Sequence, residues 1–195
     1  MKILPVMALA GALLIGAPAH AEQKLSIKPV ADKKVAELPA GELFWRIENV
    51  GSLQAAKDAA GQWGLATEAA GKVWLFTLGA RGGSSGAGTK VAEVGPIPRV
   101  TASQYLLRIN EATGPNGAIT SVHSHPGSEA FYVLAGEQSI KSAHGTMRLP
   151  AGTATAGHGA DMAMQVSSTG ASDLHALVMF VVDANRPFSS PAKFP

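Results

Sequence analysis

The chain has 195 residues, a formal net charge of +2 and no cysteine. A sequence without cysteine excludes disulfide bonds, thiol nucleophiles and zinc sites built on thiolates. The basic residues are scattered rather than gathered in runs, so the charge pattern predicts no nucleic-acid partner.

The first residues have the pattern of a signal peptide. Lys2 precedes an apolar run over residues 3–17, and Ala19-His20-Ala21 is a small-x-small cleavage sequence. We therefore predict a signal peptide at residues 1–21 and export to the periplasm or out of the cell. The rest, about 174 residues, suits one domain. No later segment has an apolar run long enough to span a membrane, so no span is expected after cleavage.

The stretch after the cleavage site does not read as a folded element. Residues 22–40 are charged and lack periodicity, which predicts a flexible N-terminal arm. The folded domain is expected over residues 41–185, beginning with a strand at residues 43–47. Strands this early are expected to extend the sheets formed by the second half of the chain.

A short helix and a glycine-rich loop follow. Ser52 suits the N-cap of a helix that runs through Ala60, because Gly61 stands where helices favour glycine at their C-terminal end. A second strand is predicted at residues 72–78. Residues 79–88 are mostly glycine and serine and predict a flexible surface loop, for which a simple connector is favoured over a lid.

The second half of the chain is predicted to be almost entirely strand. From residue 104 onward, β-type runs alternate with turn sequences rich in glycine and proline. Short strands at even spacing are typical of a sandwich or barrel. The last strong strand is expected at residues 174–182, and residues 186–195 form a proline-rich C-terminal tail without periodicity.

One hairpin in this half carries a pattern typical of a metal site. His123 and His125 stand two residues apart, so on a strand their side chains share a face. Residues 126–128 supply a turn, and Glu129 then opens the returning strand beside the two imidazoles. Two nitrogens and one carboxylate can converge on one divalent ion. A single histidine on a strand is more often a surface or hydrogen-bonded residue, so the prediction depends on the cluster.

This hairpin resembles the first motif of the cupins. The matching positions, at full spacing, are Gly117, His123, His125, Glu129 and Gly136. The resemblance covers roughly residues 104–183 and implies an all-β fold, a small double-stranded β-helix or jelly-roll barrel with one short N-terminal helix. It also implies one divalent metal ion inside the barrel, held by His123, His125 and Glu129. The family's range of metals leaves Fe, Mn, Zn, Ni and Cu as alternatives, and family analogy suggests a homodimer.

The second cupin motif is degenerate. Gly152 resembles its opening, but the position of the family's fourth metal ligand falls on Ala163, or on Met164 if one residue is inserted. Three replacements are open: His158 from the presumed turn at the barrel mouth, Met164 for a soft metal, or water. A fourth alternative is a barrel that binds no metal.

The resemblance leaves two classes of function open. One is a metal-dependent oxygenase, isomerase or related small-molecule enzyme of the exported compartment. The other is a non-catalytic module of the cupin type that binds a small ligand or acts as a sensor. In either class the partner is a small molecule. Four apolar residues are expected to shape the pocket if they face inward: Phe131, Val133, Met164 and Met179.

Overall fold

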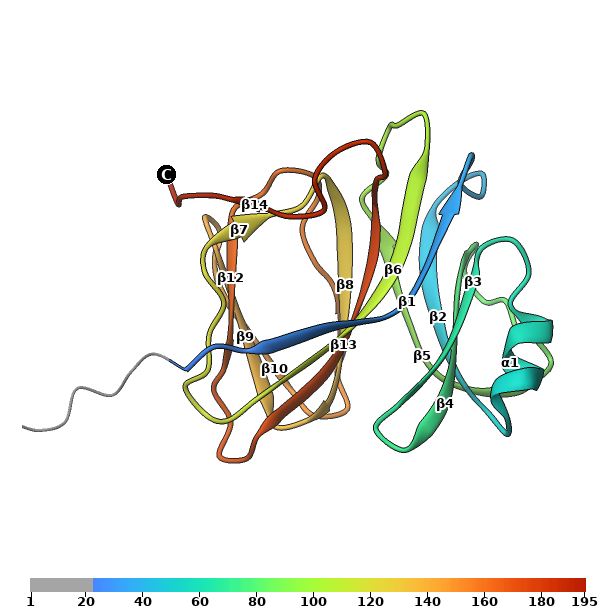
Figure 1. Cartoon of the computed structure of the whole chain (residues 1–195), viewed down its shortest axis with the longest axis horizontal. Coiled ribbons are helices and arrows are strands. Elements are labelled where there is room, and N and C mark those ends of the chain that lie inside the picture. Colours follow the sequence, from blue (N-terminus) through green and yellow to red (C-terminus); the bar gives the residue numbers. More distant parts are fainter. Residues whose placement is uncertain (1–22) are drawn as a thin grey trace, which may run out of the picture.

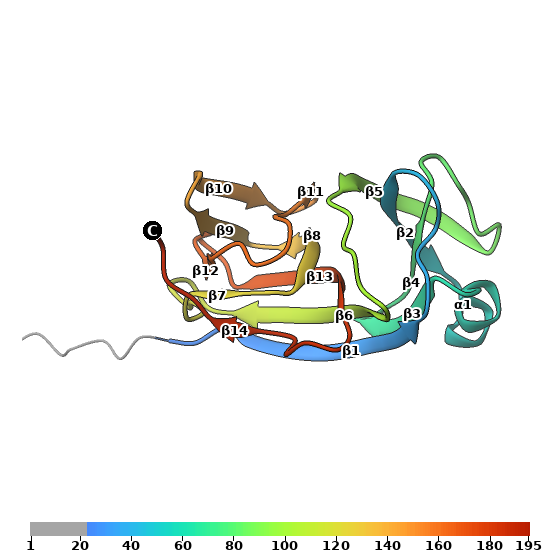
Figure 2. The ribbon, with the colours of Figure 1, turned by 90° about the horizontal axis from the view of Figure 1, so that it is seen from above.

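The computed structural model describes residues 23–195, and the predicted signal peptide lies outside this range. Two five-stranded sheets face each other and form a small barrel (Figures 1 and 2). The first barrel sheet has the order β1-β6-β13-β8-β11, from β1 Ser26–Val35, β6 Tyr105–Gly114, β13 Leu174–Asp183, β8 Gly127–Ala135 and β11 Ala154–Ala156. The second barrel sheet has the order β10-β9-β12-β7-β14, from β10 Gly145–Pro150, β9 Glu137–Ser142, β12 Met164–Ser168, β7 His123–Ser124 and β14 Ser190–Pro191.

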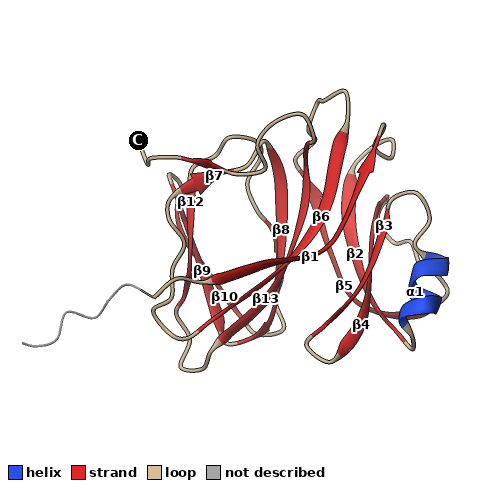
Figure 3. Ribbon diagram, in the orientation of Figure 1, coloured by secondary structure: helices blue, strands red, loops and turns tan. Residues whose placement is uncertain are grey.

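A third sheet, here called the N-terminal sheet, lies beside the barrel. Its order is β3-β4-β2-β5, from β3 Gly64–Ala69, β4 Lys72–Gly79, β2 Leu43–Val50 and β5 Gly88–Ile97. The helix α1, Leu53–Ala59, packs at the end of this sheet far from the barrel (Figure 3). The Ser52 side chain accepts a hydrogen bond from the Ala55 amide, and Gly61 has a left-handed φ of 59°, so both predicted helix boundaries are confirmed.

Strand β13 links the two hydrophobic cores of the molecule. One face packs into the barrel through Val178 and Phe180, and the other packs against the N-terminal sheet through Leu177 and Met179. A strand covered on both faces has no need of polar alternation, which explains the unbroken apolar run in this part of the sequence. The barrel therefore shares one of its walls with the N-terminal sheet.

The predicted flexible arm is wrong. Residues 26–35 form β1, which pairs antiparallel with β6 from Ser26 opposite Thr113 to Val35 opposite Tyr105. This strand lies at the edge of its sheet and is mostly exposed, and lysine and proline on such an edge prevent pairing with other chains. Because this charged segment has no regular alternation of apolar and polar residues, periodicity does not predict the strand.

The boundaries predicted for the barrel also need correction. The strands of residues 43–97 do not extend the barrel sheets, because β2 pairs with β4 and β5 rather than with any barrel strand. Residues 186–195 are not merely a tail: Ser190 pairs with Ser124 and Pro191 with His123, which adds β14 to the second barrel sheet. Both differences arise from pairing between segments distant in sequence.

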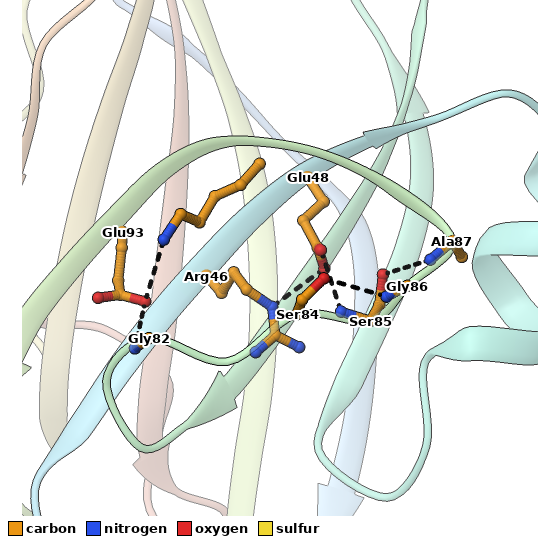
Figure 4. A network of polar contacts seen from close by, with 9 residues as sticks. Arg46, Glu48, Gly82, Ser84, Ser85, Gly86, Ala87 and Glu93 are labelled. Atoms are coloured by element: carbon orange, nitrogen blue, oxygen red, sulfur yellow. Dashed lines mark hydrogen bonds and ion pairs between the residues drawn. The ribbon is translucent and has the colours of Figure 1, made fainter.

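The glycine-rich loop between β4 and β5 is held by two carboxylates (Figure 4). Glu48, fully buried on β2, accepts hydrogen bonds from Arg46 Nε at 3.0 Å and from the Ser85 amide at 3.1 Å. Burial favours a higher pKa for Glu48, but the bonds from Ser85 and Arg46 together hold that pKa below its ordinary value. Glu93 accepts from the Gly82 amide at 2.8 Å. The loop lines no part of the barrel cavity described below, which favours the connector over the lid.

The predicted fold class, an all-β protein with a small double-sheet barrel and one short helix, is confirmed for the described residues. Within the same range, no helix has the length and apolar character needed to cross a membrane.

Candidate functional site

A cavity of about 310 Å³ lies inside the barrel, between the two barrel sheets. Its wall is mainly apolar and includes three phenylalanine rings and three of the four candidate metal ligands, His123, His125 and Glu129. The lining residues are Ile27, Asn110, Ala112, Thr120, Ser121, His123, His125, Glu129, Phe131, Val166, Val178, Phe180, Phe188 and Ser189. The motif residues therefore do line the barrel interior, but the predicted hairpin is wrong. β7 pairs with β12 and β14 in the second barrel sheet, and β8 pairs with β11 and β13 in the first, so the turn between them crosses from one sheet to the other.

Strand register sets the floor of the cavity. In the first barrel sheet, Glu129 on β8 pairs with Phe180 on β13, and the next inward-facing row joins Phe131, Val178 and Asn110 across three strands. Paired residues in a sheet share a face, so these side chains point into the barrel together. The single carboxylate of the floor thus lies next to a row that is apolar except for Asn110.

The two histidines of the motif have the same tautomer. Their rings lie 5.0 Å apart between centroids and nearly perpendicular. His123 Nδ1 lies 2.8 Å from the carbonyl oxygen of Ser121, and His125 Nδ1 lies 2.7 Å from that of Phe188. A carbonyl oxygen only accepts hydrogen bonds, so each Nδ1 carries the proton and donates it. The lone pair of each ring is therefore on Nε2, the form in which a histidine binds a metal.

Burial keeps His125 neutral. Loss of solvent lowers the pKa of His125 to about 4; the bond to the Phe188 carbonyl opposes this shift and the neighbouring His123 adds to it. At neutral pH the ring has no positive charge. Metal binding requires a neutral imidazole, so the site needs no proton release from His125 before it can bind a cation.

Glu129 is buried and lacks a countercharge. Its side chain is 4% exposed, and burial raises the pKa of Glu129 to about 8, with the backbone amide of His158 acting in the opposite direction. A carboxyl group with such a pKa holds its proton at pH 7 unless a cation comes close. An ion in the cavity would favour the charged form and compensate the cost of burying it.

The C-terminal tail completes the site. The Phe188 ring packs on His125 at 4.8 Å and on Phe180 at 4.9 Å between centroids, and the Arg108 guanidinium lies 4.5 Å from its ring centre. Phe188 therefore contributes both its carbonyl and its ring. Nothing in the sequence pattern predicts a role for this residue, because a lone phenylalanine in a proline-rich tail has no periodicity around it.

An ion pair fastens the tail to the loop before β12. Arg186 binds both carboxylate oxygens of Asp161, at 2.6 and 3.1 Å, and the Asp161 amide donates to the carbonyl oxygen of His125 at 2.8 Å. The hydrogen bonds from Arg186 lower the pKa of Asp161. His125 is thus held from two directions, by the loop through its carbonyl and by the tail through its ring.

The structure does not bring His158 to the predicted metal ligands. Its ring lies 6.1 Å from that of His144 between centroids, and His158 is not among the residues that line the cavity. Burial and the nearby His144 lower the pKa of His158. Met164 faces His123 across β12 and β7, but its side chain is buried in the barrel core and does not line the cavity either.

The four apolar residues expected to shape the pocket divide between different places. Phe131 lines the cavity, whereas Val133 and Met164 belong to the surrounding barrel core. Met179 lies on the opposite face of β13 and packs toward the N-terminal sheet. The period of a strand buried on both faces cannot show which face is inward, so only the tertiary packing separates these residues.

The donor set suits a divalent metal ion, although the side chains are not gathered around one point. Within residues 23–195, no three histidine, cysteine or acidic side chains stand close enough together to hold an ion. His123, His125 and Glu129 nevertheless line one cavity, with two free Nε2 atoms and one buried carboxyl group. These donors fit the ion chemically.

The comparisons with known proteins concern the fold. No protein-family model and no curated protein sequence matches the chain. It is similar to a cupin-like protein from Thermotoga maritima, with 15% identity and a TM-score of 0.40, over 45% of this chain and 65% of the other. It is also similar to an RmlC-like cupin family protein from Methanocaldococcus jannaschii, with 14% identity and a TM-score of 0.36, over 39% of this chain and 70% of the other. A third similar structure is DMSP lyase DddQ from Ruegeria pomeroyi, with 23% identity and a TM-score of 0.38, over 44% of this chain and 43% of the other.

Each of these similarities spans less than half of this chain, and the first spans under two thirds of the other protein. At these identities the likeness is one of fold alone. The chemistry of the site must therefore be argued from the residues that line the cavity.

Proposed function

We propose that this chain is an exported cupin-type protein that binds one divalent transition-metal ion in its barrel cavity, through His123, His125 and Glu129, and binds a small organic molecule beside it. The observation that carries the proposal is the pair of Nδ1 hydrogen bonds, at 2.8 and 2.7 Å, from the two imidazoles to backbone carbonyls. They orient the rings and leave both Nε2 atoms free in one cavity, as in histidines that bind metals.

Glu129 supplies the negative charge that the proposal requires. It is the only acidic side chain among the described residues that line the cavity, and its burial makes an uncompensated charge unfavourable. A cation bound to the two imidazoles would stabilise the carboxylate form. The three donors together match the mixed nitrogen and oxygen sets that divalent transition metals accept.

In an enzyme, the ion would supply Lewis-acid or redox chemistry of the kind used by oxygenases, isomerases and related small-molecule enzymes. The chain's own residues would exclude water and orient the substrate. Phe131, Phe180 and Phe188 form apolar walls, and the Phe188 carbonyl keeps His125 in one tautomer. Glu129 would remain bound or, once displaced, accept a proton from the substrate.

A non-catalytic small-ligand or sensor module is the second candidate. Among the described residues that line the cavity, the only ionisable side chains are His123, His125 and Glu129. If all three hold the ion, none is left as an independent acid or base. This favours a binding role, or a reaction driven by the ion itself.

The metal assignment is tested on mature protein purified after export from its native host. Elemental analysis should find about one equivalent of a transition metal in the wild type, and His123→Ala and Glu129→Ala should each lower the affinity at least tenfold, because a direct metal ligand matters more than its supporting residues. His144→Ala is the matched control, since His144 is exposed and outside the cavity. Equal metal content in all four proteins would overturn the proposal.

His158→Ala decides whether the predicted fourth ligand exists. The structure places this ring beside His144, so we expect metal affinity within twofold of the wild type. A loss of tenfold or more would mean that the loop before β12 rearranges and brings His158 to the ion.

A further inference from the structure

Asn110 is a buried polar residue of the cavity wall that the metal site does not use. Its side chain is 3% exposed on β6, it lines the cavity, and its amide oxygen has no hydrogen-bond partner within the described part of the chain. Buried amides are normally paired, because water's hydrogen bonds are lost on burial. An unpaired amide oxygen on a residue of the cavity wall makes Asn110 a candidate partner for a bound molecule.

The surroundings of Asn110 are apolar. Val178 on β13 pairs with Asn110, and Phe131 on β8 pairs with Val178 on its other side. No lysine or arginine is among the described residues that line the cavity. The side chains around Asn110 therefore offer no positive charge to a phosphate or carboxylate, and burying such a group at this end of the cavity would be costly. The phenylalanine rings favour a flat, neutral body.

The distance between Asn110 and Glu129, the two polar residues on this wall of the cavity, sets the size of the molecule that could fit between them. Asn110 and Glu129 lie two strands apart and are offset by one inward-facing row. With a strand spacing of about 4.8 Å and a rise of about 3.4 Å per residue, their Cα atoms are about 12 Å apart. Once the two side chains extend into the cavity, the remaining gap suits one ring with a substituent at each end.

We propose that the cavity binds a neutral, flat, mostly apolar molecule about one ring long, whose hydroxyl or amine group pairs with the Asn110 amide while its other end faces His123, His125 and Glu129. A hydroxyl group both donates and accepts, so it pairs with either face of the amide. This inference rests on the proposed function for the role of the cavity, but the Asn110 contact itself requires no metal.

The experiment uses two molecules of the same shape. 4-Methylphenol and 1,4-dimethylbenzene differ by one hydroxyl in place of a methyl group, and their binding to EDTA-treated mature protein is measured by ligand-observed NMR titration. We expect the phenol to bind at least tenfold more tightly, because only its hydroxyl pairs with the buried amide. Equal affinity for the two probes, or binding of neither at millimolar concentration, would overturn the inference.

Two matched variants locate the contact. Asn110→Leu should abolish the preference for the phenol, since leucine has a similar size and no hydrogen-bonding group. Gln138→Leu makes the same kind of change at a fully buried amide that also lacks partners but does not line the cavity, so the preference should persist. A preference that survives Asn110→Leu, or one that Gln138→Leu removes, would contradict the assignment.

The result of the probe experiment can be distinguished from the result of the metal-binding experiment. If metal content proves independent of His123 and Glu129 while the probe preference holds, the cavity is a ligand site without the proposed ion. If metal binds as proposed but both probes bind equally, the ligand class is wrong and the metal site stands. Equal binding of the two probes to the wild type overturns the inference even if a variant fails to fold.

Discussion

The charge state of the cavity depends on two buried residues with opposite shifts. His125 is neutral because burial lowers its pKa to about 4, and Glu129 is protonated at pH 7 because burial raises its pKa to about 8. Without a cation, neither of these two residues is therefore charged at neutral pH, although both are of types that usually titrate. Such opposed shifts at neighbouring groups are typical of functional sites.

The Glu129 shift predicts a pH dependence of stability in metal-free protein. The folded pKa lies above the ordinary value of 4.5, so the folded state keeps a proton that the unfolded chain has released. The stabilisation of the folded state that comes from protonated Glu129 is therefore fully present below about pH 4.5 and is lost as the pH rises toward 8. Relative to Glu129→Gln, the wild type should lose roughly 3 to 5 kcal/mol of unfolding free energy across this window.

Urea denaturation of both proteins in EDTA, at intervals between pH 4.5 and 8.5, measures this difference. His125 acts in the other direction: its lowered pKa removes stability as the pH falls from about 6.5 toward 4. Because His125 is present in both proteins, its effect cancels to first order in the comparison. A difference that stays constant across the range would show that Glu129 is not desolvated in the folded state.

At the scale of elements, the C-terminal tail, residues 186–195, contributes to the site although it lies outside the histidine motif of residues 117–136. Its carbonyl at Phe188 sets the tautomer of His125, and the exposed Asp161–Arg186 pair holds the preceding residues against the loop before β12. Exposed ion pairs contribute little to stability by themselves. The importance of the tail is therefore expected in metal binding rather than in overall stability.

Deletion of residues 186–195 should lower the affinity for Co²⁺ by about tenfold or more, the range typical for loss of a group that orients a metal-bound histidine. Deletion of residues 192–195 alone is the control, since it keeps Phe188 and β14. Nitrogen chemical shifts of His125 in metal-free protein provide a second measurement: only the longer deletion should produce a mixture of tautomers. Identical shifts in both truncated proteins would contradict the positioning role.

On the scale of the whole molecule, β13 separates two cores that serve different purposes. Phe180 contacts His125 and Phe188 in the barrel, whereas Met179, one residue earlier, packs toward the N-terminal sheet. The N-terminal sheet therefore supports the cavity wall from behind without contributing a residue to it. Stability and binding should respond separately to changes on the two faces.

Neighbouring substitutions on β13 test this separation. Met179→Ala should cost about 2 to 5 kcal/mol of unfolding free energy, as expected for a fully buried side chain, and should leave metal affinity within twofold. Phe180→Ala should also destabilise the protein, but it removes packing from His125 and should weaken metal binding several-fold. Denaturation curves and Co²⁺ titrations of the two variants provide both readouts, and parallel effects on affinity would argue against separate roles.

Local features of the sequence predicted much of the site. The helix cap at Ser52 depends on contacts within one turn, and the common direction of His123 and His125 follows from their two-residue spacing, although β7 ends at Ser124. Glu129 reaches the same cavity because a short turn links β7, in one barrel sheet, to β8, in the facing sheet. Such relations involve neighbours in the chain, so residue type and spacing are enough to establish them.

Tertiary structure alone decided the remaining features. The pairing of β1 with β6, the separate N-terminal sheet, the contact of Phe188 with His125 and the direction of the His158 ring all join segments far apart in the chain. Charged edge strands and a proline-rich tail have no periodicity of their own, because their partners rather than their composition determine their structure. The sequence by itself thus determined which residues of the motif would face the interior of the barrel. Long-range packing decided how the strands of the motif pair and what surrounds them, since burial and pairing depend on the whole chain.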